Sequence, residues 1–255
     1  FFSTNGPRWT HRERWIDDDN VCNWIGVGCS FGGYFTNNNH IVVVERLQLD
    51  SNNLGGTIPP SIGLLKNLIH LDISRNSIGG SIPSEMDWLT DLVEFRADRN
   101  AFKSNFPRLS NLTRLTSLQI GNNLLEGELS SLLLNLRHPR VSHNSSISVL
   151  NLGGNSFTGM IPTEIGDLTL LKELYLSENY LESTIPSEIG RLSSLMIFDI
   201  GVNSITGAIP SEIGLLRKMK EISLYRTFLT SSIPSEFYGL VQLELLSIGG
   251  NEHLQ

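Results

Sequence analysis

The feature that most constrains this chain is an asparagine that recurs at nearly constant intervals. It stands inside the pattern L-x-L-x-x-N-x-L, at intervals of 24, 24, 23, 32, 24, 24, 24 and 24 residues, and Thr227 takes its place in one unit. The asparagines are Asn52, Asn76, Asn100, Asn123, Asn155, Asn179, Asn203 and Asn251. One unit of this length cannot bury its apolar residues alone, so the units must stack into a solenoid with a continuous core.

Apolar and polar residues alternate just before each asparagine, as in Leu47-Gln48-Leu49 and Leu174-Tyr175-Leu176. A period of two is typical of a half-buried strand. The pattern therefore predicts about nine parallel strands, stacked in one sheet on the order of 40 Å long.

The asparagine itself has a structural explanation. Where each strand bends inward, its backbone groups lose their partners and are costly to bury. A carboxamide offers both donors and an acceptor, so stacked asparagines can satisfy successive turns. Thr227 can do only part of this, and we expect its turn to be locally weaker.

A proline follows a second apolar column, and it is followed by serine or threonine and then glutamate, as in Ile185-Pro186-Ser187-Glu188. We expect the serine or threonine to cap a short helical turn, and the glutamate to favour the N-terminus of that turn.

The repeat from Leu195 through Leu215 carries the consensus L-x-x-L-x-L-x-x-N-x-L-x-G-x-I-P-x-x-I-G-x-L almost intact. It resembles the plant-type subfamily of leucine-rich repeats, and the resemblance covers residues 44–255. This implies an α/β solenoid, a horseshoe of about nine 24-residue units with its parallel sheet on the concave face. Eight full units and the strand of a ninth are present. We expect no C-terminal cap here, and we expect more protein or a partner to cover the last unit.

Two cysteines, Cys22 and Cys29, lie upstream of the repeats. Taken alone they fit free thiols, half of a metal site or a disulfide, although no second cysteine or histidine pair completes a zinc set. The run from Cys22 to Cys29 resembles the subfamily's N-terminal cap, C-x-W-x-G-V-x-C, and the opening residues look more like caps of algal and protist members. The resemblance implies a cap over residues 1–43, stapled by a disulfide between these cysteines.

The fourth unit is eight residues longer than its neighbours and lacks the proline. Its surplus falls between Ser131 and Ser148 and includes four basic or histidine residues: Arg137, His138, Arg140 and His143. Loops lengthen at little cost, so a tolerated insertion explains this segment. A binding loop is the alternative.

The resemblance implies recognition of proteins, peptides or glycans at the cell surface, outside the cell or in another oxidising lumen. A net charge of −7 argues against a nucleic-acid partner, and no apolar run is long enough to insert into a membrane. His70, Asp72 and Glu94 resemble an acid–base group, but no nucleophile elbow, phosphate loop or dinucleotide fingerprint accompanies them. We therefore expect a non-catalytic binding module without a cofactor. The alternatives are a scaffold subunit of a larger extracellular or lumenal assembly, and a binder of cell-wall glycans or hydrolases.

Residues between the buried positions of each strand point outward and form the candidate partner-binding surface. A charged patch in units 2 and 3 contains His70, Asp72, Arg96 and Arg99, whose charges fit either a partner or one another. An aromatic patch in units 6 to 8 contains Tyr175, Tyr225, Arg226, Asp199 and Glu173. Tyrosine and arginine are enriched at binding hot spots, which favours this second patch as the anchor.

Two acceptor sequons for N-linked glycans begin at Asn111 and Asn144, both outside the predicted strands. We expect at least one of them to carry a glycan.

Overall fold

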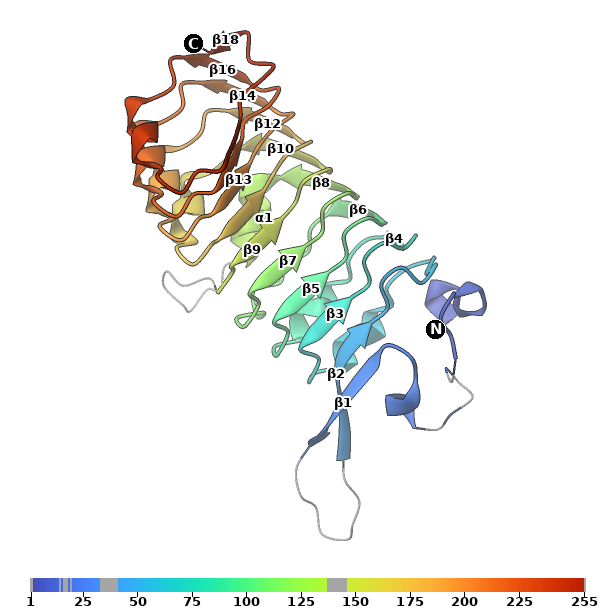
Figure 1. Ribbon diagram of the computed structural model, residues 1–255. Helices are drawn as coiled ribbons and strands as arrows, with labels where there is room; N and C mark the ends of the chain where they lie inside the picture. The colour runs from blue at the N-terminus through green and yellow to red at the C-terminus, as the bar shows by residue number, and fades with distance from the viewer. Residues whose placement is uncertain are drawn as a thin grey trace.

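The computed structural model describes residues 2–13, 15, 18, 20–32, 41–136 and 146–254. The chain forms a stack of similar turns that runs from the N-terminal hairpin to the C-terminus (Figure 1). The first sheet has ten strands, of which β1 is antiparallel to β2 and the other nine run parallel. They are β1 (Val27–Gly32), β2 (Ile41–Gln48), β3 (His70–Asp72), β5 (Glu94–Arg96), β7 (Ser117–Gln119), β9 (Val149–Asn151), β11 (Glu173–Tyr175), β13 (Ile197–Asp199), β15 (Glu221–Ser223) and β17 (Leu245–Ser247). The predicted nine-strand parallel sheet is confirmed.

A second sheet of eight parallel strands follows the asparagine turns, and the sequence analysis missed it. Its strands are β4 (Gly79–Gly80), β6 (Ala101–Asn105), β8 (Leu124–Glu128), β10 (Ser156–Met160), β12 (Tyr180–Ser183), β14 (Ser204–Gly207), β16 (Phe228–Ser231) and β18 (His253–Leu254). Each of the longer strands buries a single large side chain, such as Phe157 in β10. One apolar residue between polar neighbours is too short a pattern to separate a strand from a loop.

Among the described residues, short 3₁₀ turns occur both in the N-terminal segment and in the repeats. Three are in the N-terminal segment, η1 (Phe2–Thr4), η2 (Gly6–Arg8) and η3 (Val21–Asn23), and six are in the repeats, η4 (Pro60–Leu64), η5 (Ser84–Trp88), η6 (Thr163–Asp167), η7 (Ser187–Arg191), η8 (Ser211–Leu215) and η9 (Ser235–Gly239).

The expectation that serine or threonine caps these turns is wrong. Pro186 occupies the N-cap position of η7 in extended backbone, so Ser187 is already inside the turn. Its hydroxyl lies 3.4 Å from the carboxylate of Glu188 and makes no capping bond. The glutamate does lie in the first turn, as predicted.

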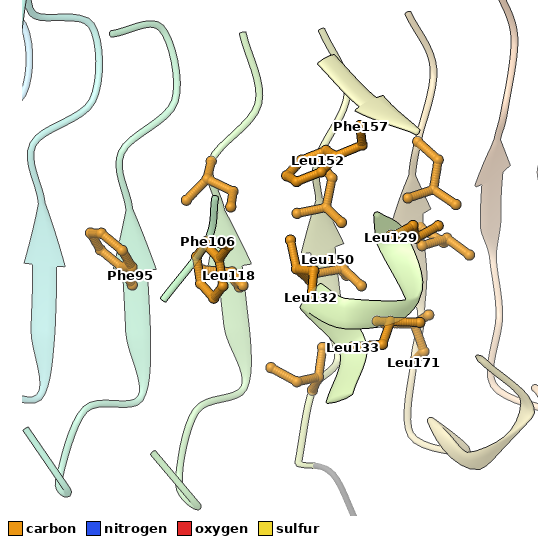
Figure 2. Packing of buried hydrophobic residues seen from close by; sticks show 14 of the residues in the cluster. Phe95, Phe106, Leu118, Leu129, Leu132, Leu133, Leu150, Leu152, Phe157 and Leu171 are labelled. Atoms are coloured by element: carbon orange, nitrogen blue, oxygen red, sulfur yellow. The ribbon is translucent and has the colours of Figure 1, made fainter. Parts of the chain in front are cut away.

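The fourth unit replaces its 3₁₀ turn with α1 (Leu129–Leu136), the one α-helix among the described residues. Ser130 stands where the other units have proline, so the backbone keeps the N–H that a helix requires. Leu129, Leu132 and Leu133 of this helix are buried in the same layer as Leu150 and Leu171 (Figure 2). Residues 137–145 of the surplus, which include Arg137, His138, Arg140, His143 and the sequon asparagine Asn144, lie outside the described residues.

The recurrent asparagines bind the backbone as the sequence predicts. The Asn179 carboxamide NH₂ lies 3.1 Å from the carbonyl oxygens of Leu152 and Leu176, and its oxygen accepts from the Phe157 N–H at 2.9 Å. Each carboxamide therefore joins its own turn to the preceding one. The side chain is buried, so these bonds are shielded from water.

The N-terminal segment covers the first layer. Cys22 and Cys29 form a disulfide, with 5.7 Å between their Cα atoms, which confirms the pairing that the resemblance implied. Three indoles pack behind it: the ring centroids of Trp9 and Trp15 are 4.8 Å apart, and those of Trp15 and Trp24 are 4.7 Å apart.

Candidate functional site

The outward side of the ten-stranded sheet, which we call the strand face, and the turns that follow its strands carry the residues predicted from the sequence as candidates for partner binding. In β11 the central Leu174 is fully buried, while Glu173 and Tyr175 on either side of it are half-buried. β3 and β13 show the same pattern. Side chains of neighbouring strands therefore form columns on this face.

The charged patch is brought together, and two of its members, His70 and Arg96, both pair with Glu94 beside them. Register places His70 beside Glu94 and Asp72 beside Arg96. Glu94 lies 3.2 Å from the His70 Nδ1 and 2.7 Å from the Arg96 Nε. Asp72 accepts bonds from the backbone N–H and hydroxyl of Ser74, at 3.0 and 2.7 Å. A partner at this patch must compete with these internal bonds.

Asp98 of unit 3 adds an acidic group next to the charged patch, near Asp72, Arg75 and Arg99. Burial raises the pKa of its carboxyl above the ordinary value, and repulsion from Asp72 adds to this effect. Arg75 and Arg99 lower it in part. Arg99 is exposed at a turn with a φ of 55°, so its guanidinium remains accessible to a partner.

Tyr175 lies on β11, at one end of the aromatic patch, in an acidic environment. Its hydroxyl donates to the Glu173 carboxylate at 3.2 Å. Burial is the main cause that raises the pKa of this phenol to about 12, and the charges of Glu173, Glu221 and Asp199 act in the same direction. The ring is therefore neutral and partly buried, rather than fully raised above the sheet. Glu221 was not among the residues selected from the sequence.

Tyr225 and Arg226 form a cation–π pair two units beyond Tyr175, just after β15. The Arg226 guanidinium lies 5.2 Å from the centroid of the Tyr225 ring, a distance at which cations and aromatic rings attract. The ring also lies against Gly249, where an added methyl would meet it at 3.5 Å. Tyr225 is 38% exposed, so the ring keeps an accessible surface.

Asp199 lies between the two tyrosine-bearing units. Register pairs it with Tyr175 in β11 and with Ser223 in β15. Its carboxylate accepts the backbone N–H of Gly201 at 3.1 Å, which fixes its orientation. Tyr175 and Asp199 are therefore direct neighbours, and Tyr225 lies beyond the end of β15.

The second sheet exposes apolar side chains that the sequence analysis also missed. Tyr180 is 66% exposed and Phe228 is 64% exposed, more than Tyr225. Both directly follow the recurrent asparagine position, where most other units carry small or polar residues. That contrast is a signal visible in the sequence.

Asn111, the sequon asparagine within the described residues, is exposed. Its side-chain NH₂ donates to Asp87 at 2.7 Å, and its backbone N–H donates to the other oxygen of the same carboxylate at 2.7 Å. A glycan would replace one of the two hydrogens of this NH₂ group, and its presence stays a prediction.

Neither metal sites nor membrane spans are found in the part of the chain that the structure describes. No group of three or more histidine, cysteine, aspartate or glutamate side chains there is placed to hold a metal ion. No described helix is long and apolar enough to cross a membrane.

Comparison with known proteins relates this architecture to plant receptors. The Leucine Rich Repeat family model matches residues 44–65, 67–89, 146–168 and 170–192. The receptor protein-tyrosine kinase CEPR2 of Arabidopsis thaliana is 42% identical over 171 residues, which are 66% of this chain and 16% of the kinase.

Two solved ectodomains are similar over nearly the whole chain. That of the Arabidopsis thaliana receptor kinase GASSHO1/SCHENGEN3, in complex with CASPARIAN STRIP INTEGRITY FACTOR 2, has a TM-score of 0.83 and 36% identity, over 94% of this chain and 27% of its own. That of the Arabidopsis receptor kinase HAESA, with an IDA peptide hormone, has a TM-score of 0.79 and 29% identity, over 92% and 37%. This chain thus spans only a fraction of each relative.

Proposed function

We propose that this chain, a leucine-rich-repeat solenoid of the plant receptor type, is the non-catalytic binding region of a receptor and recognises a protein or peptide on its strand face. The observation that carries this proposal is the similarity to the GASSHO1/SCHENGEN3 ectodomain, which was solved in complex with CASPARIAN STRIP INTEGRITY FACTOR 2 and covers 94% of this chain. The kinase activity in the relatives' names is not carried over, because the alignment with CEPR2 covers only 16% of that protein.

An extracellular location belongs to the same proposal. The Cys22–Cys29 disulfide is stable in an oxidising compartment and uncommon in a reducing one. Receptor ectodomains of this type bind ligands outside the cell, and the disulfide agrees with that placement.

The aromatic patch is the proposed anchor, since a partner can reach it without breaking an ion pair. Tyr175 offers its ring, because its hydroxyl is bonded to Glu173. Tyr225 offers a ring held by Arg226, whose guanidinium retains donors for a partner carbonyl or carboxylate. In the charged patch, by contrast, Glu94 already pairs with both His70 and Arg96.

The test is selection of a random 12-residue peptide library on the wild-type protein, followed by measurement of Kd for the enriched peptides. We expect the Tyr175→Ala/Tyr225→Ala double variant to bind at least about 30-fold more weakly, because a hot-spot aromatic contributes about 2 kcal/mol or more. Tyr180→Ala is the matched control: it removes a more exposed tyrosine from the second sheet and should leave Kd unchanged.

Undiminished affinity in the double variant would remove the aromatic patch from the proposal. Failure to enrich any peptide would instead favour the scaffold role or the glycan and hydrolase binders, for which no peptide site is needed.

A further inference from the structure

A cavity of about 240 Å³ lies between the N-terminal segment and the first layer of the solenoid. Its walls include the three indoles of Trp9, Trp15 and Trp24, together with Val44, Ile58 and Leu65. It lies at the opposite end of the chain from the aromatic patch, and it is independent of the function proposed for the strand face.

The cavity arises because the first layer is not covered by a copy of itself. Ile62 and Leu65 of the first unit correspond to Ile189 and Leu192 of the sixth. The latter two are fully buried at 0% exposure, whereas Ile62 and Leu65 are only partly buried. The side chains that a preceding unit would supply are replaced by the N-terminal segment, which leaves space.

The chemistry of the walls excludes a polar occupant. All three indole N–H groups are bonded to backbone carbonyls: Trp9 to Thr4 at 2.8 Å, Trp15 to Ile25 at 2.9 Å and Trp24 to Asp18 at 2.8 Å. The described lining residues otherwise contribute aliphatic side chains, a proline, and the hydroxyls of Ser3 and Thr4. A charged ligand would lose its hydration here without adequate replacement.

We propose that this cavity binds a flat, uncharged aromatic molecule of about two fused rings. An apolar cavity of about 150 Å³ accommodates benzene, so 240 Å³ suits the next larger ring system. The indoles already pack at centroid separations of 4.7 and 4.8 Å, within the range that favours aromatic pairs. A further ring would continue this arrangement. The alkyl side chains of Val44 and Leu65 form part of the remaining wall.

The test uses 1-fluoronaphthalene, followed by its fluorine NMR signal as the full chain is titrated. Saturable binding is expected in wild type, and naphthalene-1-sulfonate should bind at least 10-fold more weakly. Val44→Phe places a larger side chain in the cavity and should weaken binding at least 10-fold. Val241→Phe makes the same substitution at an exposed position far along the chain and should bind as wild type.

Circular dichroism and intact Cys22–Cys29 pairing confirm that each variant is folded, and Leu65→Phe replaces Val44→Phe if the latter does not fold. Three results would overturn the proposal: no saturable binding by wild type, equal affinity for the sulfonate, or wild-type affinity in a folded cavity-filling variant. Peptide binding on the strand face is measured separately, so either result stands without the other.

Discussion

The N-terminal layer and the interior layers solve one packing problem in two ways. In units 5 to 7 each layer lies between copies of itself, and side chains such as Leu174, Ile189 and Phe198 are fully buried. At the N-terminal end the covering segment is unlike the repeat; it uses tryptophans and a disulfide, and it leaves a cavity. Neighbouring repeats therefore bury the apolar side chains of the interior layers, whereas each end of a solenoid needs a separate covering segment.

The hydrogen bonds of the recurrent asparagines also differ between the interior and the N-terminal end. The carboxamide of Asn76 donates to the Leu49 carbonyl of the preceding unit at 2.8 Å. Asn52 has no preceding unit, and its carboxamide bonds instead to the backbone N–H and carbonyl of His11. The backbone of the N-terminal segment therefore takes the place of a missing repeat at this position, even though its side chains do not fill the layer.

The largest expected effect comes from equivalent truncations in the two layers. Ile189→Ala should lower the free energy of unfolding by about 3–4 kcal/mol, because it opens a cavity in a closed layer. Ile62→Ala should cost about 1–2 kcal/mol, because its layer is already open to the cavity. Urea unfolding of both variants measures the difference, and equal losses would mean that the two layers are packed alike.

The next effect tests the interior hydrogen bonds. Asn179→Ala should lower the free energy of unfolding by about 2–3 kcal/mol, because it leaves buried carbonyls and the Phe157 N–H without partners. Thr227→Ala, at the equivalent position one unit beyond Asn203, should cost about 1 kcal/mol, because Thr227 makes fewer bonds. Urea unfolding measures both variants. A larger loss of unfolding free energy for Thr227→Ala than for Asn179→Ala would contradict the proposed contribution of the asparagine hydrogen bonds.

The disulfide should act locally. Cys22→Ser/Cys29→Ser should destabilise the N-terminal segment by about 2 kcal/mol, because a short closed loop loses its constraint in the unfolded chain. Hydrogen exchange should then accelerate in β1 and β2 while β11 and β13 keep their protection. Faster exchange throughout would show that the two regions unfold together.

Some features of the fold could be predicted from the sequence, and others could not. The period predicted the first sheet and the bonding of Asn179, because every unit repeats the same strong signal. The second sheet and the 3₁₀ turns also repeat, but the sequence analysis missed the former and expected caps at the latter, because their local signals are short. Features that occur once were predicted poorly. The eight-residue surplus of the fourth unit was interpreted as a lengthened loop, whereas the segment from Leu129 to Leu136 forms a helix.

The candidate site shows the same limit at the level of side chains. Alternation placed Tyr175 on the strand face, but its bond to Glu173 and the nearby charge of Glu221 depend on neighbouring units in register. The pairing of Glu94 with both His70 and Arg96 likewise depends on rotamers. The sequence left partner binding and self-pairing open for the charged patch, and the structure favours self-pairing.

The smallest expected effect is a gain. Thr227 is the one member of the series that lacks a carboxamide: its hydroxyl lies 3.0 Å from the Leu224 carbonyl and 2.7 Å from the Asn251 oxygen. Among the described residues, no bond joins it to the Ile205 N–H, the counterpart of the Leu181 N–H that donates to Asn203 at 2.9 Å.

Thr227→Asn restores that acceptor and a donor for the Ile200 carbonyl, at the loss of the bond to Asn251. Since a buried hydrogen bond contributes about 1 kcal/mol, we expect the free energy of unfolding to rise by about that amount. Thr158→Asn, the same change at an exposed position of the second sheet, should be close to neutral. If Thr227→Asn destabilises the chain while Thr158→Asn does not, the turn at unit 8 has adapted to the hydroxyl, and the interior is less uniform than its period suggests.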